Sequence, residues 1–120
     1  MFVTKYLSIF SCLIAVAAAA ECYGPDRIRS FNGAGSSALS SLSWDGNNRR
    51  CTFASGPNGS VCKACYRTSG QPKRFGEAKG NIQDQCLSGT PSYTQGYWEA
   101  DGLRVCFDCV NSPNCNGQTM

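Results

Sequence analysis

The 120-residue sequence contains no histidine, and this absence removes much of the usual chemistry of enzymes. Histidine is the commonest general base near neutral pH, and it completes the usual catalytic triads and most catalytic metal sites. Carboxylates could still act in pairs on a glycosidic bond, but no two are placed convincingly for that chemistry, and Asp45 and Asp101 belong to predicted turns. We therefore expect a protein that is not an enzyme and that uses no cofactor.

A long apolar run is also missing from the chain after residue 20. The run before it, residues 7–20, follows one early positive charge at Lys5 and ends in four alanines ahead of Glu21. This is the layout of a secretory signal peptide, and a transmembrane helix would need roughly 20 apolar residues with flanking anchors. No retention or lipid-anchor signal occurs at the C-terminus. We expect residues 1–20 to be a signal peptide and residues 21–120 to be a single cysteine-rich domain that is secreted and extracellular.

Cysteine, in contrast, is abundant. Cys12 would leave with the signal peptide, and eight cysteines would remain in about a hundred residues. An even number at this density in an exported chain is typical of a disulfide scaffold. Bridges that contribute roughly 2–4 kcal/mol each would compensate for a small core. The predicted disulfide residues are Cys22, Cys51, Cys62, Cys65, Cys86, Cys106, Cys109 and Cys115.

Two nearly identical cysteine motifs organise the chain: V-C-K-A-C-Y at residues 61–66 and V-C-F-D-C-V at residues 105–110. A Cys₄ zinc site is disfavoured, because 40 residues separate Cys65 from Cys106 whereas zinc sites typically have 15–20. A redox dithiol would begin a helix, whereas both motifs lie in predicted strands. Residues three apart in a strand point to opposite faces, so each motif should reach two different partners. The sequence leaves 105 possible pairings open.

The pattern of turn residues and β-formers predicts a small, disulfide-rich, mainly β fold with one short helix, and an α+β fold is the alternative. Asn81 as N-cap and Gly89 beyond the end predict the helix over residues 80–89. Residues 33–43 fit either a frayed helix or a loop. The other predicted elements are a turn at 24–26, a strand near residues 28–31, a hairpin over 43–53, a turn at 56–60 and a strand at 60–68.

The strongest local pattern is a hairpin of residues 93–100 and 103–110. Asp101-Gly102 between them favours a two-residue type I′ turn. Such a turn fixes the register. It would set Trp98 opposite Val105 and Glu99 opposite Arg104.

The mature chain divides near residue 75 into halves with four cysteines each. Trp44, an Asp-Gly turn and Cys51 in the first half resemble Trp98, an Asp-Gly turn and Cys106 in the second. An internal two-fold repeat, 21–74 and 75–120, is one hypothesis, and chance similarity in a cysteine-rich chain is the other.

Three further features are candidate sites. Asn58, in Asn-Gly-Ser within a predicted turn, is a candidate glycosylation site, or simply a turn asparagine. Lys73 and Arg74 form a dibasic pair, which is either a processing site or part of a solvated loop. Tyr93 and Tyr97 share one strand face, which could bind a sugar or a protein partner or be a half-buried sheet surface.

Charge is uneven along the chain. Residues 21–80 carry nine basic and four acidic side chains, whereas residues 81–120 carry one and four. Loss of Lys5 with the signal peptide would leave ten basic against eight acidic residues, a net charge of +2. A basic half can meet anionic lipid headgroups, uronate polymers or nucleic acid, but such asymmetry also arises when two halves complement each other. We expect no nucleic-acid partner.

In its signal peptide, its size, its eight cysteines and its Cys-x-x-Cys pairs, the whole chain resembles the small secreted cysteine-rich proteins of filamentous fungi. That group includes host-directed effectors and antifungal or killer-toxin-like polypeptides. The resemblance implies a monomer that binds a host protein or a cell-wall glycan without catalysis. The alternative is a membrane-active or antimicrobial toxin, which would place Arg49, Arg50, Lys73 and Arg74 on one face and act on a membrane surface. Hydrophobins are disfavoured because adjacent Cys-Cys doublets are absent.

Overall fold

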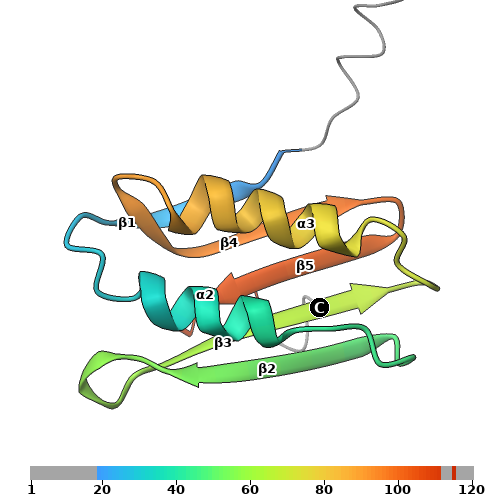
Figure 1. The fold of residues 1–120 in the computed structure, drawn as a ribbon, viewed down its shortest axis with the longest axis horizontal. Coiled ribbons are helices and arrows are strands. Elements are labelled where there is room, and N and C mark those ends of the chain that lie inside the picture. Colours follow the sequence, from blue (N-terminus) through green and yellow to red (C-terminus); the bar gives the residue numbers. More distant parts are fainter. Residues whose placement is uncertain (1–18, 112–114, 116–120) are drawn as a thin grey trace, which may run out of the picture.

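A computed structural model describes residues 19–111 and Cys115. In this part of the chain, five strands form one antiparallel sheet in the order β1-β4-β5-β3-β2 (Figure 1). The predicted signal peptide, apart from its last two residues, lies outside the described residues. The elements are β1 (Glu21–Asp26), α2 (Asn32–Ser41), β2 (Arg49–Ser55), β3 (Val61–Thr68), α3 (Phe75–Ile82), β4 (Ser92–Ala100) and β5 (Leu103–Asp108), with a 3₁₀ turn at Pro57–Gly59 and a π-helical turn at Gln83–Leu87.

Both helices lie on one face of the sheet, side by side (Figure 1). Helix α2 packs against β2 and β3, and α3 packs against β4 and β5. The chain thus contains two helix-strand-strand units, α2-β2-β3 and α3-β4-β5, and the division predicted near residue 75 falls between them. Trp44 and Trp98 nevertheless occupy unlike positions, because Trp44 is 38% exposed in a loop and Trp98 is fully buried. The internal repeat stays a hypothesis.

The hydrophobic core lies between the helices and the sheet. Strands alternate their side chains between two faces, so every second residue of β3, β4 and β5 points at the helices. Burial of each large side chain there contributes about 1.5–3 kcal/mol. The largest of these fully buried side chains are Trp98, Tyr66, Phe107 and Val105 from the sheet, Leu39, Ile82 and Leu87 from the helices and the π-helical turn, and Leu42 just after α2.

The hairpin of β4 and β5 is confirmed in position and register. Trp98 pairs with Val105 and Glu99 pairs with Arg104. Asp101 and Gly102 have φ values of 53° and 76°, the left-handed conformation that a type I′ turn requires at both positions. The strand predicted at 60–68 is also confirmed as β3.

Four disulfides connect the eight cysteines predicted to pair. Neither Cys-x-x-Cys motif closes on itself, as the alternation of strand side chains predicted. Two bridges lie on the helix side of the sheet and two on the side away from the helices. The helix-side bridges are Cys22–Cys86 and Cys62–Cys109, and the others are Cys51–Cys65 and Cys106–Cys115. The small, mainly β, four-disulfide fold is therefore confirmed.

The hairpin predicted over residues 43–53 is wrong. Only its second part is a strand, and β2 pairs with β3 across the turn at 56–60. The Asp-Gly and Asn-Asn residues instead form a loop, in which Asp45 accepts the backbone N–H of Asn47 at 3.0 Å. Trp44 Nε1 donates to the Asn47 carbonyl at 3.1 Å. Local side-chain bonds of this kind compete with strand pairing.

The turn predicted at 24–26 is also wrong, because these residues belong to β1. Proline is tolerated there because β1 is an edge strand, and Gly24 takes a φ of 68°. Of residues 33–43, which the sequence left open between helix and loop, residues 33–41 belong to α2. The helix predicted over residues 80–89 begins at Phe75, five residues before the expected start, in a stretch whose glycines and polar residues concealed the helix, and it continues into the π-helical turn that ends at Leu87.

Candidate binding surface

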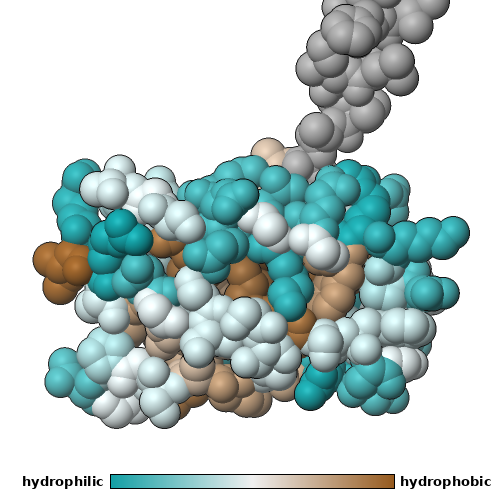
Figure 2. Space-filling model, in the orientation of Figure 1, coloured by the Kyte–Doolittle hydropathy of each residue, from teal (hydrophilic) through white to brown (hydrophobic). Residues whose placement is uncertain are grey.

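The face of the sheet that turns away from the helices is called the open face here. Directly paired residues of neighbouring strands share a face, so the strand register arranges the residues of the open face in rows that cross the strands. Figure 2 shows the opposite, helix-covered side, where hydrophilic and neutral residues cover most of the surface and apolar residues show between them. The candidate binding residues gather on the open face.

An apolar hollow of about 420 Å³ opens at one end of this face. Phe53, Val61 and Val110 line it and are 64%, 53% and 47% exposed. Phe53 of β2 and Lys63 of β3 are direct partners, and Lys63 in turn pairs with Asp108 of β5. The hollow thus combines apolar walls with one basic and one acidic residue.

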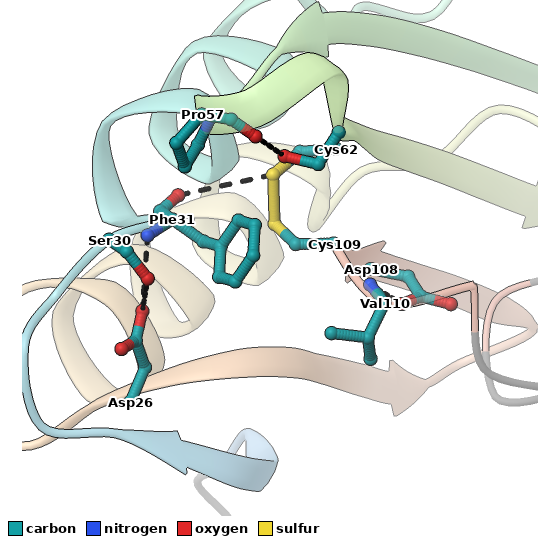
Figure 3. Close-up of a disulfide and its surroundings, with 9 residues drawn as sticks. Asp26, Ser30, Phe31, Pro57, Cys62, Asp108, Cys109 and Val110 are labelled. Atoms are coloured by element: carbon teal, nitrogen blue, oxygen red, sulfur yellow. Dashed lines mark hydrogen bonds between the residues drawn. A yellow bond between two sulfur atoms is a disulfide. The ribbon is translucent and has the colours of Figure 1, made fainter.

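Asp108 is almost fully buried although it belongs to this hollow. Its Oδ1 accepts the backbone N–H of Val110 at 2.8 Å, as Figure 3 shows beside the Cys62–Cys109 bridge. This bond holds the chain end of β5 in a turn. It places Val110 at the wall of the hollow.

The other end of the open face is basic. Arg49 of β2 pairs with Arg67 of β3, and Arg67 pairs with Arg104 of β5. Glu99 of β4 completes this row, and its carboxylate lies 3.3 Å from Arg104 Nη1. Arg67, Arg104 and Glu99 line a second hollow of about 360 Å³ beside the Asp101-Gly102 turn.

Tyr97, one of the two predicted binding tyrosines, lies on the open face between two neighbours. The Arg104 guanidinium is 3.9 Å from the centre of its ring, and the ring of Tyr23 stacks at 6.3 Å. A hydrogen bond with Tyr97 raises the pKa of Tyr23. Tyr93 is half buried against the main core. The structure therefore does not bring the two tyrosines together as an exposed pair, and their role in binding stays a prediction.

Two disulfides occupy the middle of the open face. The sulfur atoms of Cys65, Cys106 and Cys115 lie within 4.8 Å of one another, close enough for a metal site. Each is bonded in a disulfide, either Cys51–Cys65 or Cys106–Cys115. A metal needs thiolates, which these sulfur atoms do not offer in the bridged state.

The dibasic pair lies at the start of α3. Arg74 forms ion pairs with Glu77 and, at 2.8 Å, with Asp101, and its guanidinium lies 5.0 Å from the centre of the Trp98 ring. These bonds, first that with Glu77, raise the pKa of Arg74. Phe75 follows it and packs edge-on against Tyr66 at 5.4 Å. A protease would have to release these contacts to cut here, and processing stays a prediction.

Asn58 is exposed in the turn between β2 and β3, with a φ of 56°. The turn position that the sequence predicted is confirmed, and glycosylation of Asn58 stays a prediction. Ser60 of the same sequon lines the apolar hollow. A glycan on Asn58 would therefore stand beside that hollow.

Buried and half-buried polar groups elsewhere serve the fold. Asp26 accepts hydrogen bonds from Ser30 Oγ at 3.0 Å and from the Phe31 backbone at 3.1 Å, where the chain turns into α2 (Figure 3). Lys79 donates to the carbonyls of Ser40 and Leu42 at the end of α2, and its burial lowers the pKa of the ammonium group. These residues tie α2 to its surroundings.

Sequence reasoning missed the apolar hollow and the row of arginines. Phe53, Val61, Arg49 and Arg67 are visible in the sequence, but only the register of β2, β3 and β5 shows which of them are neighbours. The predicted hairpin at 43–53 gave β2 the wrong partner and so concealed both groups.

Across the described residues, no helix is long and apolar enough to cross a membrane. Comparison of the chain with protein-family models, with curated proteins and with solved structures found no match.

Proposed function

We propose that this chain is a secreted, effector-like binding protein that captures a host or other extracellular protein on its open face without catalysis. The observation that carries the proposal is the apolar hollow, where Phe53, Val61 and Val110 stay exposed around Lys63 and Asp108. Exposed apolar residues that cluster in this way mark interaction sites on soluble proteins.

A partner that covers these three side chains would gain their burial, about 1.5–3 kcal/mol for each one removed completely from water. Such apolar anchors usually dominate the energy of a protein interface. Lys63 would orient the partner, because a partner that covers its charge has to supply an acceptor or an opposite charge. Phe53 is the one aromatic ring among the residues that line the hollow, and the Tyr97 ring already has Arg104 and Tyr23 as neighbours. This end of the face thus suits a protein better than a sugar.

The disulfides support the extracellular part of the proposal. Four bridges form and persist in oxidising compartments, and the chain begins with the layout of a signal peptide. The toxin alternative needs Arg49, Arg50, Lys73 and Arg74 on one face. Arg50 instead pairs with Asp45 at 3.7 Å, and Arg74 pairs with Glu77 and Asp101. These ion pairs favour the binding protein over the toxin.

The test compares two serine substitutions in the mature, fully bridged protein. Phe53→Ser changes the hollow, whereas Ile28→Ser changes a residue that is 85% exposed and does not line it. The wild-type protein would be cross-linked in the host's extracellular fluid, and the partner identified and purified. We expect Phe53→Ser to weaken the affinity for that partner by tenfold or more, roughly the effect of one anchor, and Ile28→Ser to leave it unchanged.

Equal affinities of wild type and Phe53→Ser would contradict the proposal, as would equal losses in both variants. Leakage of anionic lipid vesicles caused by the wild-type protein, and lost at high salt, would instead support the toxin.

A further inference from the structure

The strand β2 forms one border of the sheet. Figure 1 shows no other helix or strand of the described chain beyond it. On its inner side, β2 pairs with β3 without interruption from Arg49 to Ser55. The N–H and C=O groups on the outer side of such a strand are a template for one further strand, unless the sequence blocks it.

Two backbone hydrogen bonds show which groups of β2 point outward. Thr68 N–H donates to the Asn48 carbonyl at 2.9 Å, and Gly56 N–H donates to the Ser60 carbonyl at 2.8 Å. Bonded and non-bonded positions alternate along an antiparallel pair, so the odd-numbered residues between these two bonds face away from β3. The residues of this outer row that concern us are Cys51, Phe53 and Ser55. Within the described part of the chain, their outward N–H and C=O groups have no hydrogen-bond partner.

The strand at the opposite border, β1, is blocked by its own sequence. Pro25 has no N–H to donate, and Gly24 takes a φ of 68°, outside the range of a strand. β2 contains neither residue type. Its Phe53 side chain is 64% exposed on the open face, beside the outward backbone groups. Of the two borders, β2 is therefore the one that can accept another strand along its length.

We infer that β2 binds an extended segment of the partner protein as a sixth strand of the sheet, through main-chain hydrogen bonds. The inference rests on the proposed function, because the segment belongs to the partner that covers Phe53. The outward groups of β2 offer a donor and an acceptor at every second residue, and an extended polypeptide backbone supplies the matching acceptors and donors. A sugar chain or a lipid headgroup has no such series. Every second side chain of the segment would lie on the open face, where one packs against the Phe53 ring.

A second copy of this chain fits the border less well than a segment of another protein. Its available strand would be its own β2, since β1 is blocked. That strand carries Arg49 and Arg50 and no acidic residue, so a pair of copies would add positive charge to a basic strand. A segment with neutral or acidic side chains avoids this repulsion.

The experiment compares substitutions in the mature, fully bridged protein for affinity to the partner identified by cross-linking. Ser55→Pro removes one outward N–H and places a ring at the border, whereas the hydrogen bonds to β3 remain. We expect this variant to bind tenfold or more weakly, because an acceptor of the segment loses its donor. Ser55→Ala is the matched control, since it keeps the N–H, and it should bind as the wild type. Urea unfolding verifies that both variants are folded.

Amide hydrogen exchange of the wild-type protein gives a second readout that depends on no variant. In the free protein, the N–H groups of Cys51 and Phe53 should exchange faster than those of Thr52 and Ala54, which face β3. In the complex with the partner, exchange at Cys51, Phe53 and Ser55 should slow by tenfold or more.

Wild-type affinity in a folded Ser55→Pro variant would overturn the inference, as would an equal loss in Ser55→Ala or unchanged exchange of the outward amides in the complex. If Phe53→Ser still weakened binding in those cases, the proposed function would stand, so the two can fail separately. Slow exchange of the same amides in a self-associated protein without partner would assign the border to a second copy. Failure to find any partner would overturn the proposed function and this inference with it.

Discussion

The two faces of the sheet carry two disulfides each, yet their other side chains have opposite roles. The helix side buries Trp98, Tyr66 and Phe107 completely. The open face keeps Phe53 and Val61 in contact with solvent and sets three arginines side by side. Because strand side chains alternate, the same strands build both surfaces. The buried core and the surface that we propose for binding are thus separated by the pleat of the sheet rather than by position along the chain.

The two Cys-x-x-Cys motifs illustrate this separation, since the first cysteine of one motif and the first cysteine of the other point to opposite faces of the sheet. Cys62, the first cysteine of β3, points to the helix side, whereas Cys106, the first cysteine of β5, points to the open face. Cys62 can therefore reach Cys109 on the helix side. Cys65 and Cys106 are direct partners on the open face, and each bridges elsewhere. A shift of one residue moves a whole motif to the other face.

The strongest test of the comparison removes one large side chain from each face. Trp98→Ala empties the centre of the helix-side core and should lower the free energy of unfolding by about 3–5 kcal/mol. Phe53→Ala removes an exposed side chain and should change it by no more than about 0.5 kcal/mol. Urea unfolding with the disulfides intact measures both. A large loss in Phe53→Ala would show that the open face also stabilises the fold.

The disulfides of the two faces should differ in how much each contributes to the free energy of unfolding. On the helix side, Cys62–Cys109 spans 47 residues, whereas Cys51–Cys65 on the open face spans 14. Loop entropy predicts a contribution of about 4 kcal/mol for the first and about 3 kcal/mol for the second. Urea unfolding of Cys62→Ala/Cys109→Ala and Cys51→Ala/Cys65→Ala should follow this order.

Accessibility gives an independent readout of the same bridges. Cys51 is exposed, whereas Cys62 and Cys109 are buried. A mild thiol reductant should therefore open Cys51–Cys65 first, as alkylation and peptide mass mapping would show. Earlier opening of Cys62–Cys109 would contradict the protection that we assign to the helix side.

A smaller change in stability is expected from a substitution at Gly96, where the core contacts the backbone of β4. A Cβ atom on Gly96 would lie 2.8 Å from Cys86 Sγ and 2.9 Å from the Glu21 carbonyl oxygen, neither of which can move freely. Gly96→Ala should lower the stability by about 1–3 kcal/mol through overpacking. Gly80→Ala in α3 meets no atom within 4 Å and should instead add up to about 1 kcal/mol through helix propensity. Thermal unfolding of the pair tests whether the two signs differ.

Local patterns in the sequence were sufficient for part of this architecture. Asp101-Gly102 predicted the β4–β5 hairpin with its register, because both residues favour the left-handed conformation that the turn needs. Alternation also predicted that neither cysteine motif would close on itself. These features depend on residues that are close together in the chain.

The rest depends on contacts between distant segments. The strand order puts β1 beside β4 and β5 beside β3, and no local pattern encodes that choice. The disulfide pairing follows from the same order, since the pairing of β1 with β4 is what places Cys22 beside Cys86 in the fold. The row of arginines likewise depends on the β3–β5 pairing. This pairing makes Arg104 a neighbour of Arg67, although the two are far apart in sequence.

The smallest predicted effect is a loss of stability at acid pH, and we expect it to come from carboxylates near the helix side of the sheet. The Tyr66 hydroxyl, at the end of a buried core side chain, lies 2.9 Å from Asp45 Oδ1. The backbone N–H of Asn47 and then this hydroxyl hold the pKa of Asp45 below its ordinary value. Arg74, which lies against Trp98, likewise lowers the pKa of Glu77.

A carboxylate with a lowered pKa stabilises the fold fully above the ordinary value of about 4, and this contribution is lost as the pH falls through the lowered pKa. The melting temperature should therefore decline in that range, and Asp45→Asn and Glu77→Gln should each make the decline shallower. Asp84→Asn is the control, because Asp84 is exposed and its side chain forms no hydrogen bond or ion pair among the described residues. If the decline kept its slope in both test variants, the acid-sensitive carboxylates would have to lie elsewhere, and the helix side would owe its stability to apolar packing and disulfides alone.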